Sequence, residues 1–322
     1  MSGDEPASGR GSASGREPAS GREPVRGGVA ADPEWWGTER VSVRYGRRLA
    51  LDQVTFRARP GQVSAVVGGD GAGRSTLLRC LGGALAPSSG TVRRPPQRDI
   101  GYLPASSGTY PDLTVAENLA FRAAAYQLPA AAAAERSAAF LARAGLAAAR
   151  DRLAGQLSGG MRQKLGVIAA MLTSPALLVL DEPTTGVDPV SRADLWSLIA
   201  RAAADGAAVV VATSYLDEAE RAAAVLVLDA GRQLAVGTPD QIVAAMPGQL
   251  RVSDTVPPGD DRPRAWRRAG RWRVWDPAGT ASGQPVRPDL QDAVTVAILG
   301  RELAGTGELA ADGAGSGDGG TG

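Results

Sequence analysis

Residues 63–76, VSAVVGGDGAGRST, constrain the fold more than any other part of the sequence. A short apolar run stops at a group of glycines, and the STLLRCLGG that follows has helical spacing. Glycine allows tight left-handed turns, so backbone N–H groups can approach an anion, and a helix that begins there points its positive end at the same place. The segment therefore predicts a strand, a phosphate-binding loop and a helix. The predicted loop consists of Gly68, Gly69, Asp70, Gly71, Ala72, Gly73, Arg74, Ser75 and Thr76.

The remainder of the chain places this loop in an α/β fold. Apolar strand patterns such as PALLVLDEP, AAVVVATS and VLVLDAG alternate with helical patterns such as SRADLWSLIARAAADG. Alternating strands and helices favour a parallel or mixed core sheet that helices cover on both faces. An alanine- and leucine-rich segment at about 104–157 is expected to be an inserted helical subdomain. The main domain is expected to span residues 35–240.

Both ends of the chain differ from this pattern. Residues 1–34 repeat EPASGR-like units and 305–322 are rich in glycine, so both are expected to be disordered tails. Residues 241–304 predict a small C-terminal β-α subdomain, in which AWRRAGRWRVWDPAG forms a strand pair and DLQDAVTVAILGREL a helix. Tryptophans among arginines could also stack on single-stranded nucleic acid, but inward packing of the aromatic rings is favoured.

Two carboxylates follow a predicted apolar strand about a hundred residues after the loop. In LLVLDEP, Asp181 is placed to reach a magnesium ion through water, and Glu182 to polarise an attacking water. Ser75 would place its hydroxyl on the same magnesium. A pair of acids can also be a solvated strand end. Together with the glycine loop, however, the pair predicts a site for a triphosphate and Mg²⁺, with Glu182 as the catalytic residue.

The order of the motifs resembles that of an ATP-binding cassette (ABC) ATPase. The likeness covers residues 41–242, through YGRRLALDQVTF, IGYLP, YPDLTVAENL, LSGGMRQK, LLVLDEPTTGVDP, SYLDEAE and AVGTPDQI. It implies the P-loop fold of that family and a head-to-tail pair of cassettes. In such a pair, each ATP lies between the glycine loop of one cassette and the LSGG signature of the other.

The resemblance also assigns roles to single residues. Tyr45 would stack on adenine, as its aromatic face suits a purine. Ser158, Gly159 and Gly160 would cap the phosphates of the ATP bound by the partner cassette, and Asp188 would couple the two sites.

Three positions depart from the pattern of the family, and all belong to the chain's own site. Arg74 replaces lysine, Ala105 replaces glutamine and Ser214 replaces histidine. A planar guanidinium is not equivalent to a compact ammonium, so the substitutions indicate a site that binds nucleotide and turns it over slowly or not at all. The alternative is ordinary turnover, with Arg74 a product of bias toward arginine in a chain that has no histidine and a single lysine, Lys164.

More narrowly, the chain is similar to the first cassette of tandem-cassette exporter ATPases and to drug-resistance exporter ATPases. This likeness implies an ATP-binding subunit of an exporter, partnered by a second cassette, preferably a different one, and by a multi-span membrane permease. A non-hydrolysing, ATP-responsive regulatory or structural cassette is the main alternative. A soluble ABC protein acting on ribosomes or DNA is a third, but two fused cassettes or a long coiled coil would be expected there.

Composition limits the remaining function classes. The net charge of +1 provides no overall field toward nucleic acid, so no nucleic-acid partner is expected. One cysteine, Cys80, excludes an internal disulfide framework, and no apolar run is long enough to span a membrane. The chain is therefore expected to be cytoplasmic and peripheral on the inner face of the cell membrane.

Overall fold

A computed structural model of the chain describes residues 35–278 and 284–314. Among these residues, nine strands form one sheet in the order β4-β1-β2-β9-β8-β3-β7-β6-β5. Their bounds are β1 (Trp36–Tyr45), β2 (Arg48–Ala58), β3 (Val63–Val67), β4 (Ser89–Arg93), β5 (Ile100–Leu103), β6 (Leu177–Asp181), β7 (Ala208–Ala212), β8 (Ala224–Asp229) and β9 (Arg232–Gly237).

The sheet is mixed in direction. Strands β8, β3, β7, β6 and β5 run parallel to one another, as do β2 and β9, whereas β1 pairs antiparallel with β2 and β4, and β8 with β9. The carboxyl ends of parallel strands meet at one edge of a sheet, so the glycine loop after β3 and the two acids at the end of β6 come out on the same side.

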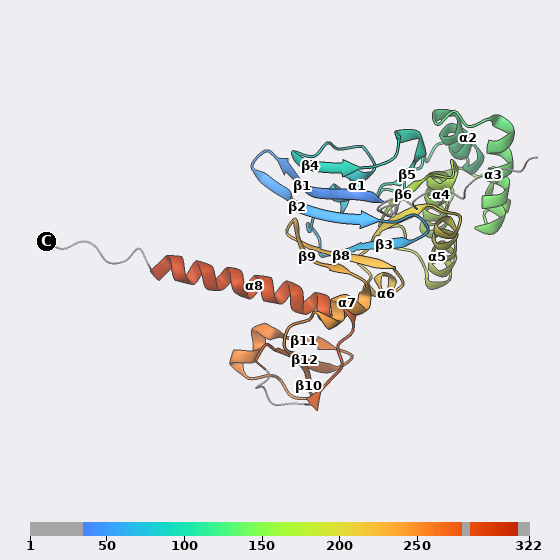
Figure 1. Ribbon diagram of the computed structural model, residues 1–322. Helices are drawn as coiled ribbons and strands as arrows, with labels where there is room; N and C mark the ends of the chain where they lie inside the picture. Colours follow the sequence, from blue (N-terminus) through green and yellow to red (C-terminus); the bar gives the residue numbers. More distant parts are fainter. Residues whose placement is uncertain (1–34, 279–283, 315–322) are drawn as a thin grey trace, which may run out of the picture. The chain divides into compact units, whose positions relative to one another are not determined.

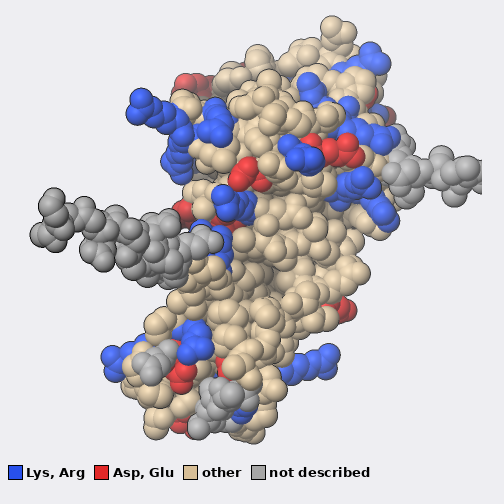
Figure 2. Space-filling model, turned by 60° about the vertical axis from the view of Figure 1, so that its left-hand side comes forward, with Lys and Arg blue, Asp and Glu red and all other residues tan. Residues whose placement is uncertain are grey.

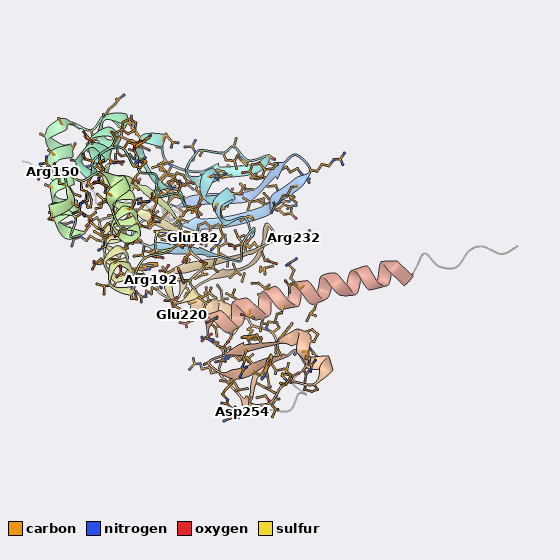
Figure 3. The ribbon with its side chains drawn as sticks, turned by 180° about the vertical axis from the view of Figure 1, so that it is seen from behind. Arg150, Glu182, Arg192, Glu220, Arg232 and Asp254 are labelled. Carbon is orange, nitrogen blue, oxygen red and sulfur yellow. The ribbon has the colours of Figure 1, made fainter. Side chains whose placement is uncertain are left out.

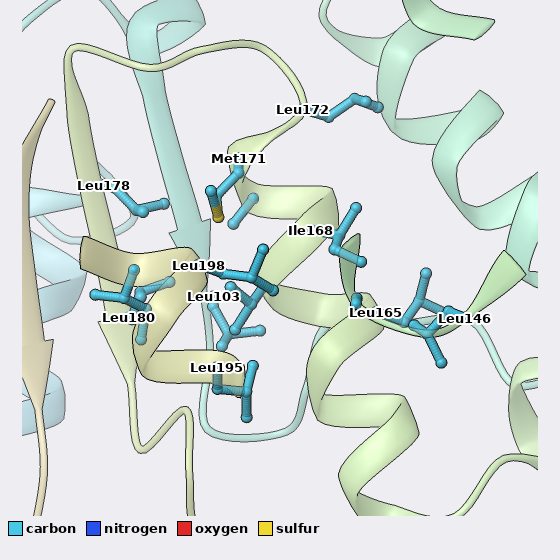
Figure 4. Packing of buried hydrophobic residues seen from close by; sticks show 14 of the residues in the cluster. Leu103, Leu146, Leu165, Ile168, Met171, Leu172, Leu178, Leu180, Leu195 and Leu198 are labelled. Atoms are coloured by element: carbon cyan, nitrogen blue, oxygen red, sulfur yellow. The ribbon is translucent and has the colours of Figure 1, made fainter. Parts of the chain in front are cut away.

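The central strands are apolar throughout because helices cover both faces. Successive side chains of a strand point to opposite faces. Accordingly, Leu178 and Leu180 of β6 pack with α4 and α5, while Leu177 and Val179 pack in the cluster that contains α1. Figure 4 shows the first of these clusters, in which Leu178 and Leu180 of β6 lie on one side and Leu165 of α4 lies beside Leu146 on the other.

Different helices cover the two faces of the large sheet. Figure 1 shows α2 and α3 on the β5–β6 side of the sheet, where they and the adjoining 3-10 turns occupy much of residues 104–157. A capping box between Thr114 and Glu117 begins α2, as both hydrogen bonds of the motif are formed. The helix bounds are α1 (Arg74–Leu81), α2 (Val115–Ala125), α3 (Ala130–Arg143), α4 (Gly159–Met171), α5 (Pro189–Ala204), α6 (Leu216–Ala219), α7 (Pro239–Ala244) and α8 (Leu290–Ala314); 3-10 turns are η1 (Gln97–Asp99), η2 (Ala147–Ala149), η3 (Ala154–Gln156) and η4 (Gly259–Arg264).

A second, four-stranded sheet follows α7. It has the order β11-β12-β10-β13, with β10 (Gln249–Ser253), β11 (Ala265–Arg268), β12 (Arg271–Asp276) and β13 (Gln284–Pro285). The predicted strand pair is β11 and β12, joined by a two-residue turn in which Ala269 and Gly270 both have positive φ.

The aromatic side chains of this smaller sheet do not form an open stacking platform. Trp275 is buried and donates its indole N–H to the carbonyl of Pro247 at 2.8 Å, and Trp266 and Trp272 are half-buried. Helix α8 is tied to the sheet by Asp292, which is fully buried and accepts hydrogen bonds from Arg268 at 3.0 Å and Arg273 at 2.8 Å. This part of the chain is therefore built as a packed β-α unit.

The predicted fold class is confirmed in its mixed core sheet, helical segment and C-terminal β-α unit. One boundary differs, because α8 continues through Ala314 whereas a disordered tail was expected from residue 305. Extending an existing helix by good helix formers such as Ala, Leu and Glu is far easier than starting one. The predictions for residues 1–34 and 315–322 fall outside the described residues.

Charged side chains are mixed on the surface. On the face that Figure 2 shows, acidic side chains lie among the basic ones. This arrangement agrees with the nearly balanced charge of the sequence.

Candidate functional site

The loop between β3 and α1 has the backbone that its glycines predict. Gly71 has a φ of 78° and Gly73 a φ of 103°, both in the left-handed region. A Cβ on Gly73 would lie 2.7 Å from the carbonyl oxygen of Ala50, and one on Gly68 would collide with the carbonyl oxygen of Leu228. Larger residues at these positions would thus push the loop away from the strands that support it.

A cavity of about 420 Å³ lies over this loop. Tyr45, at the end of β1, forms one side of it and is 45% exposed, so the face of its ring is accessible. Two further residues, Arg48 and Ala50 of β2, line the cavity although the sequence motifs did not single them out. The loop contributes Gly69, Asp70, Gly71, Ala72, Gly73, Arg74, Ser75 and Thr76, whereas Gly68 does not line the cavity and packs against the backbone of Leu228.

Arg74 and Glu182 form an ion pair in this site. The Nη1 atom of Arg74 lies 2.7 Å from Oε1 of Glu182, and the two side chains are only 11% and 17% exposed. The angle at Nη1 does not meet hydrogen-bond geometry, so the contact is a pairing of charges. Asp70 also pairs with Arg74, at 3.8 Å, but its side chain is fully exposed. The cation of the loop is therefore already paired with the predicted catalytic carboxylate.

Glu182 is fixed by several other contacts. Its backbone has a φ of 51°, which is held by a hydrogen bond from its own N–H to Ala212 and by one from the Gln163 side chain to its carbonyl at 3.0 Å. The hydroxyl of Thr185 donates to Oε2 at 2.7 Å and that of Ser214 at 3.3 Å. Each carboxylate oxygen of Glu182 thus has a protein partner. Figure 3 shows Glu182 beside the sheet, away from Arg150 on the helical segment.

Asp181 has the properties of a metal ligand. It is buried at the end of β6, its Oδ1 atom has no hydrogen-bond partner, and the Ser75 hydroxyl is near enough to the carboxyl group to lower its pKa. Burial raises the pKa of Asp181, and the nearby Glu182 adds to the rise, while Ser75, Arg74 and Arg79 oppose it. A buried carboxylate oxygen without a partner, beside a hydroxyl, fits Mg²⁺, which prefers oxygen ligands.

The signature residues lie together at a different edge. Ser158 caps α4 by accepting a hydrogen bond from the N–H of Met161 at 3.3 Å, and Asp188 caps α5 by accepting from Val190 and Ser191. A Cβ on Gly160 would lie 3.6 Å from the Asp188 carboxylate, so the two helix starts are neighbours. The hydrogen bonds from Ser191 lower the pKa of Asp188.

This edge faces solvent and is separate from the glycine cavity. Ser158, Gly159 and Asp188 are exposed, whereas Gly160 is buried, and none of the four lines the cavity. Within one chain the structure therefore brings the loop, Tyr45, Asp181 and Glu182 to one place, and 158–160 with Asp188 to another.

The other two departures from the family pattern differ in position. Ala105 follows β5 as an exposed methyl side chain, so it offers no polar group to the site. Ser214 follows β7 and contacts Glu182, so its position does belong to the site.

A buried network next to Ser214 was missed by sequence reasoning. Glu218 is 1% exposed and accepts a hydrogen bond from the Thr213 hydroxyl at 2.7 Å. Arg192, in the first turn of α5, lies 3.8 Å from Glu218 and stacks over Tyr215 at 4.3 Å. The motif SYLDEAE contains these residues, but their pairing with α5 could not be predicted from it.

Comparison with known proteins agrees with this geometry. The family described as ABC transporter matches residues 51–185. The chain is 41% identical over 245 residues to a probable multidrug ABC transporter ATP-binding protein, YbhF of Escherichia coli, covering 73% of this chain and 42% of that protein. It is also 36% identical over 210 residues to the Nod factor export ATP-binding protein I of Cupriavidus metallidurans, covering 62% and 69% respectively. The chain thus spans less than half the length of YbhF.

Solved structures show the same fold. A structure described as the ATP-binding subunit of an ABC transporter matches 66% of this chain and 92% of its own, with a TM-score of 0.61 and 29% identity. The ATP-binding cassette MJ0796, in a dimeric structure bound to ADP and phosphate, matches 63% of this chain and 98% of its own, with a TM-score of 0.57 and 22% identity. From its motifs, its fold and these relatives, the chain belongs to the ABC transporter family, as one of its ATP-binding cassettes.

Proposed function

We propose that the chain is the ATP-binding subunit of an ABC exporter, in which ATP closes a pair of cassettes and hydrolysis reopens it. The cavity beside Tyr45 and the glycine loop supports the nucleotide part of this proposal. The names of the relatives, a multidrug transporter subunit and a Nod factor exporter subunit, support export. ATP with Mg²⁺ would be held by the loop, Ser75 and Asp181, and Tyr45 would stack on the adenine.

The chain's own site is proposed to hydrolyse ATP slowly. The observation that carries this is the ion pair between Arg74 and Glu182. A carboxylate that is paired with a guanidinium, and that also accepts two hydroxyl hydrogen bonds, is less able to take a proton from an attacking water. Ala105 offers no polar group where the family has glutamine, and Ser214 contacts Glu182 with a side chain shorter than the family's histidine.

The edge formed by Ser158, Gly159, Gly160 and Asp188, called the signature edge, is proposed to complete the site of a second cassette. Ser158 and Gly159 are exposed at the start of α4, where N–H groups and the helix dipole favour phosphate. Asp188 lies beside them, where it could couple the two sites. Because this edge keeps the family's residues while the chain's own site does not, a different cassette is the preferred partner.

The remaining partner is proposed to be a multi-span membrane permease, which would contact the groove between the sheet and the helical segment at 104–157. In the parts of the chain that the structure describes, no helix combines the length and apolarity needed to cross a bilayer. Peripheral attachment to the inner face of the cell membrane would then depend on the permease.

A non-hydrolysing, ATP-responsive cassette is the second candidate. The same ion pair favours it. If pairing with Arg74 prevents Glu182 from acting as a base at all, the site would bind ATP without turnover. The two candidates differ in whether the site can be restored.

The test measures nucleotide binding and ATPase activity of the purified chain, alone and with a candidate partner cassette. A triple variant, Arg74→Lys with Ala105→Gln and Ser214→His, is compared with the wild type and with Glu220→Gln, an exposed control labelled in Figure 3. A clear rise in turnover supports the view that these three positions limit hydrolysis. No rise would refute it, and absence of nucleotide binding by the wild type would refute the proposed function.

A further inference from the structure

Arg48 lies opposite the glycine loop, on the side from which it would contact a bound phosphate. It is the first residue of β2 and pairs across the hairpin with Tyr45, the last residue of β1. Its Nη2 atom lies 3.6 Å from where a Cβ on Gly71 would be, so the guanidinium stands over the middle of the loop. Both Arg48 and Tyr45 line the cavity, which places this cation between the aromatic side and the loop.

The charges around the cavity make Arg48 the available cation. Of the two arginines that line it, Arg74 is nearly buried and paired with Glu182. Arg48 is exposed and makes no ion pair with any residue that the structure describes. Arg44 and Arg47, on the same hairpin, are also exposed and without an ion pair among the described residues. Neither of these two lines the cavity, so Arg48 is the hairpin arginine whose charge reaches it.

We propose that Arg48 is a phosphate-binding residue of this site, which grips the polyphosphate of a nucleoside di- or triphosphate from the side opposite the amides of the loop. A guanidinium presents a planar fork of N–H donors that matches phosphate oxygens, and its charge shortens and strengthens those hydrogen bonds. Arg48 thereby supplies charge that Arg74 does not, because Glu182 holds Arg74. This inference rests on the proposed function, since it names a further binding residue of the same site.

The test titrates the full chain with fluorescent ATP and ADP analogues and displaces them with the unlabelled nucleotides. Arg48→Gln removes the charge, Arg48→Lys keeps it without the fork, and Arg47→Gln is the matched control on the same hairpin that does not line the cavity. Arg48→Gln is expected to weaken ATP and ADP binding about tenfold, as for loss of a charge-assisted hydrogen bond. Arg48→Lys should recover part of the loss, and Arg47→Gln should change affinity less than about twofold.

A salt series separates a charge contact from a structural role. Arg48 is exposed, so the difference between the wild type and Arg48→Gln should shrink as ionic strength rises. An unchanged affinity for Arg48→Gln, an equal loss for Arg47→Gln, or a loss that salt does not alter would overturn the inference while leaving the proposed function intact. A wild type that binds neither ATP nor ADP would overturn both.

Discussion

Replacing Glu182 by glutamine is expected to strengthen nucleotide binding by this chain, because the carboxylate competes with phosphate for Arg74. The paired atoms lie 2.7 Å apart, and both side chains are less than a fifth exposed, so solvent screens them only partly. An ion pair of this kind contributes about 1 kcal/mol, and its release changes an equilibrium constant by about fivefold. Glutamine also removes a negative charge from the phosphate site. The Glu182→Gln variant should therefore bind adenosine nucleotides about fivefold more tightly than the wild type.

The assay is a titration with a fluorescent ADP analogue at low protein concentration. ADP is used because blocked hydrolysis alone would raise the apparent affinity for ATP. The low protein concentration disfavours dimerisation of the cassettes. Glu220→Gln, which removes an exposed carboxylate from α6's end, should leave the affinity unchanged. Equal or weaker binding by Glu182→Gln would refute the argument that Glu182 restrains Arg74.

Three further predictions concern stability, all measured by denaturant unfolding. Gly73→Ala should lower the free energy of unfolding by about 1–3 kcal/mol, because alanine is strained at a φ of 103° and its Cβ meets Ala50; Gly206→Ala, with a similar φ and open space, isolates the strain alone. Asp292→Ala should lower it by about 3–5 kcal/mol by leaving Arg268 and Arg273 without their buried partner, whereas Asp254→Ala at an exposed pair should change it by less than about 1 kcal/mol. Burial would raise the pKa of Asp289, but the hydrogen bond from Arg268 outweighs it and lowers the pKa to about 2, so the wild type should lose its advantage over Asp289→Asn as the pH falls from about 4 to about 2.

The parts of the site that are local in sequence could be predicted. The turns at Gly71 and Gly73, the helix start after them and the buried strand ending at Asp181 each follow from a few consecutive residues. The caps of α4 and α5 at Ser158 and Asp188, where a side-chain oxygen satisfies the first N–H groups, are also local in sequence, although only the roles of these residues in a cassette pair were predicted.

Contacts between distant segments could not be predicted. Nothing in RYGRR shows that Arg48 reaches over the glycine loop, because β2 and β3 are separated by β9 and β8 in the sheet and only the folded chain brings Arg48 to the loop after β3. The pairing of Arg74 with Glu182 likewise depends on the order of strands in the sheet. The extent of α8 was underestimated, because residues 290–304 have the helical pattern that was predicted whereas the glycine-containing residues that continue the helix through Ala314 do not.

The central claim is that the chain contributes to ATP hydrolysis mainly through its signature edge, which completes the site of the partner cassette. Its own site at the glycine loop hydrolyses ATP slowly. The direct test is ATPase activity of the chain mixed with its partner cassette, with Glu182→Gln or Ser158→Arg in this chain and Ser197→Arg as an exposed control on α5. The account predicts that Glu182→Gln and Ser197→Arg keep most of the turnover and that Ser158→Arg abolishes it. Loss of turnover with Glu182→Gln, together with normal turnover for Ser158→Arg, would contradict the account.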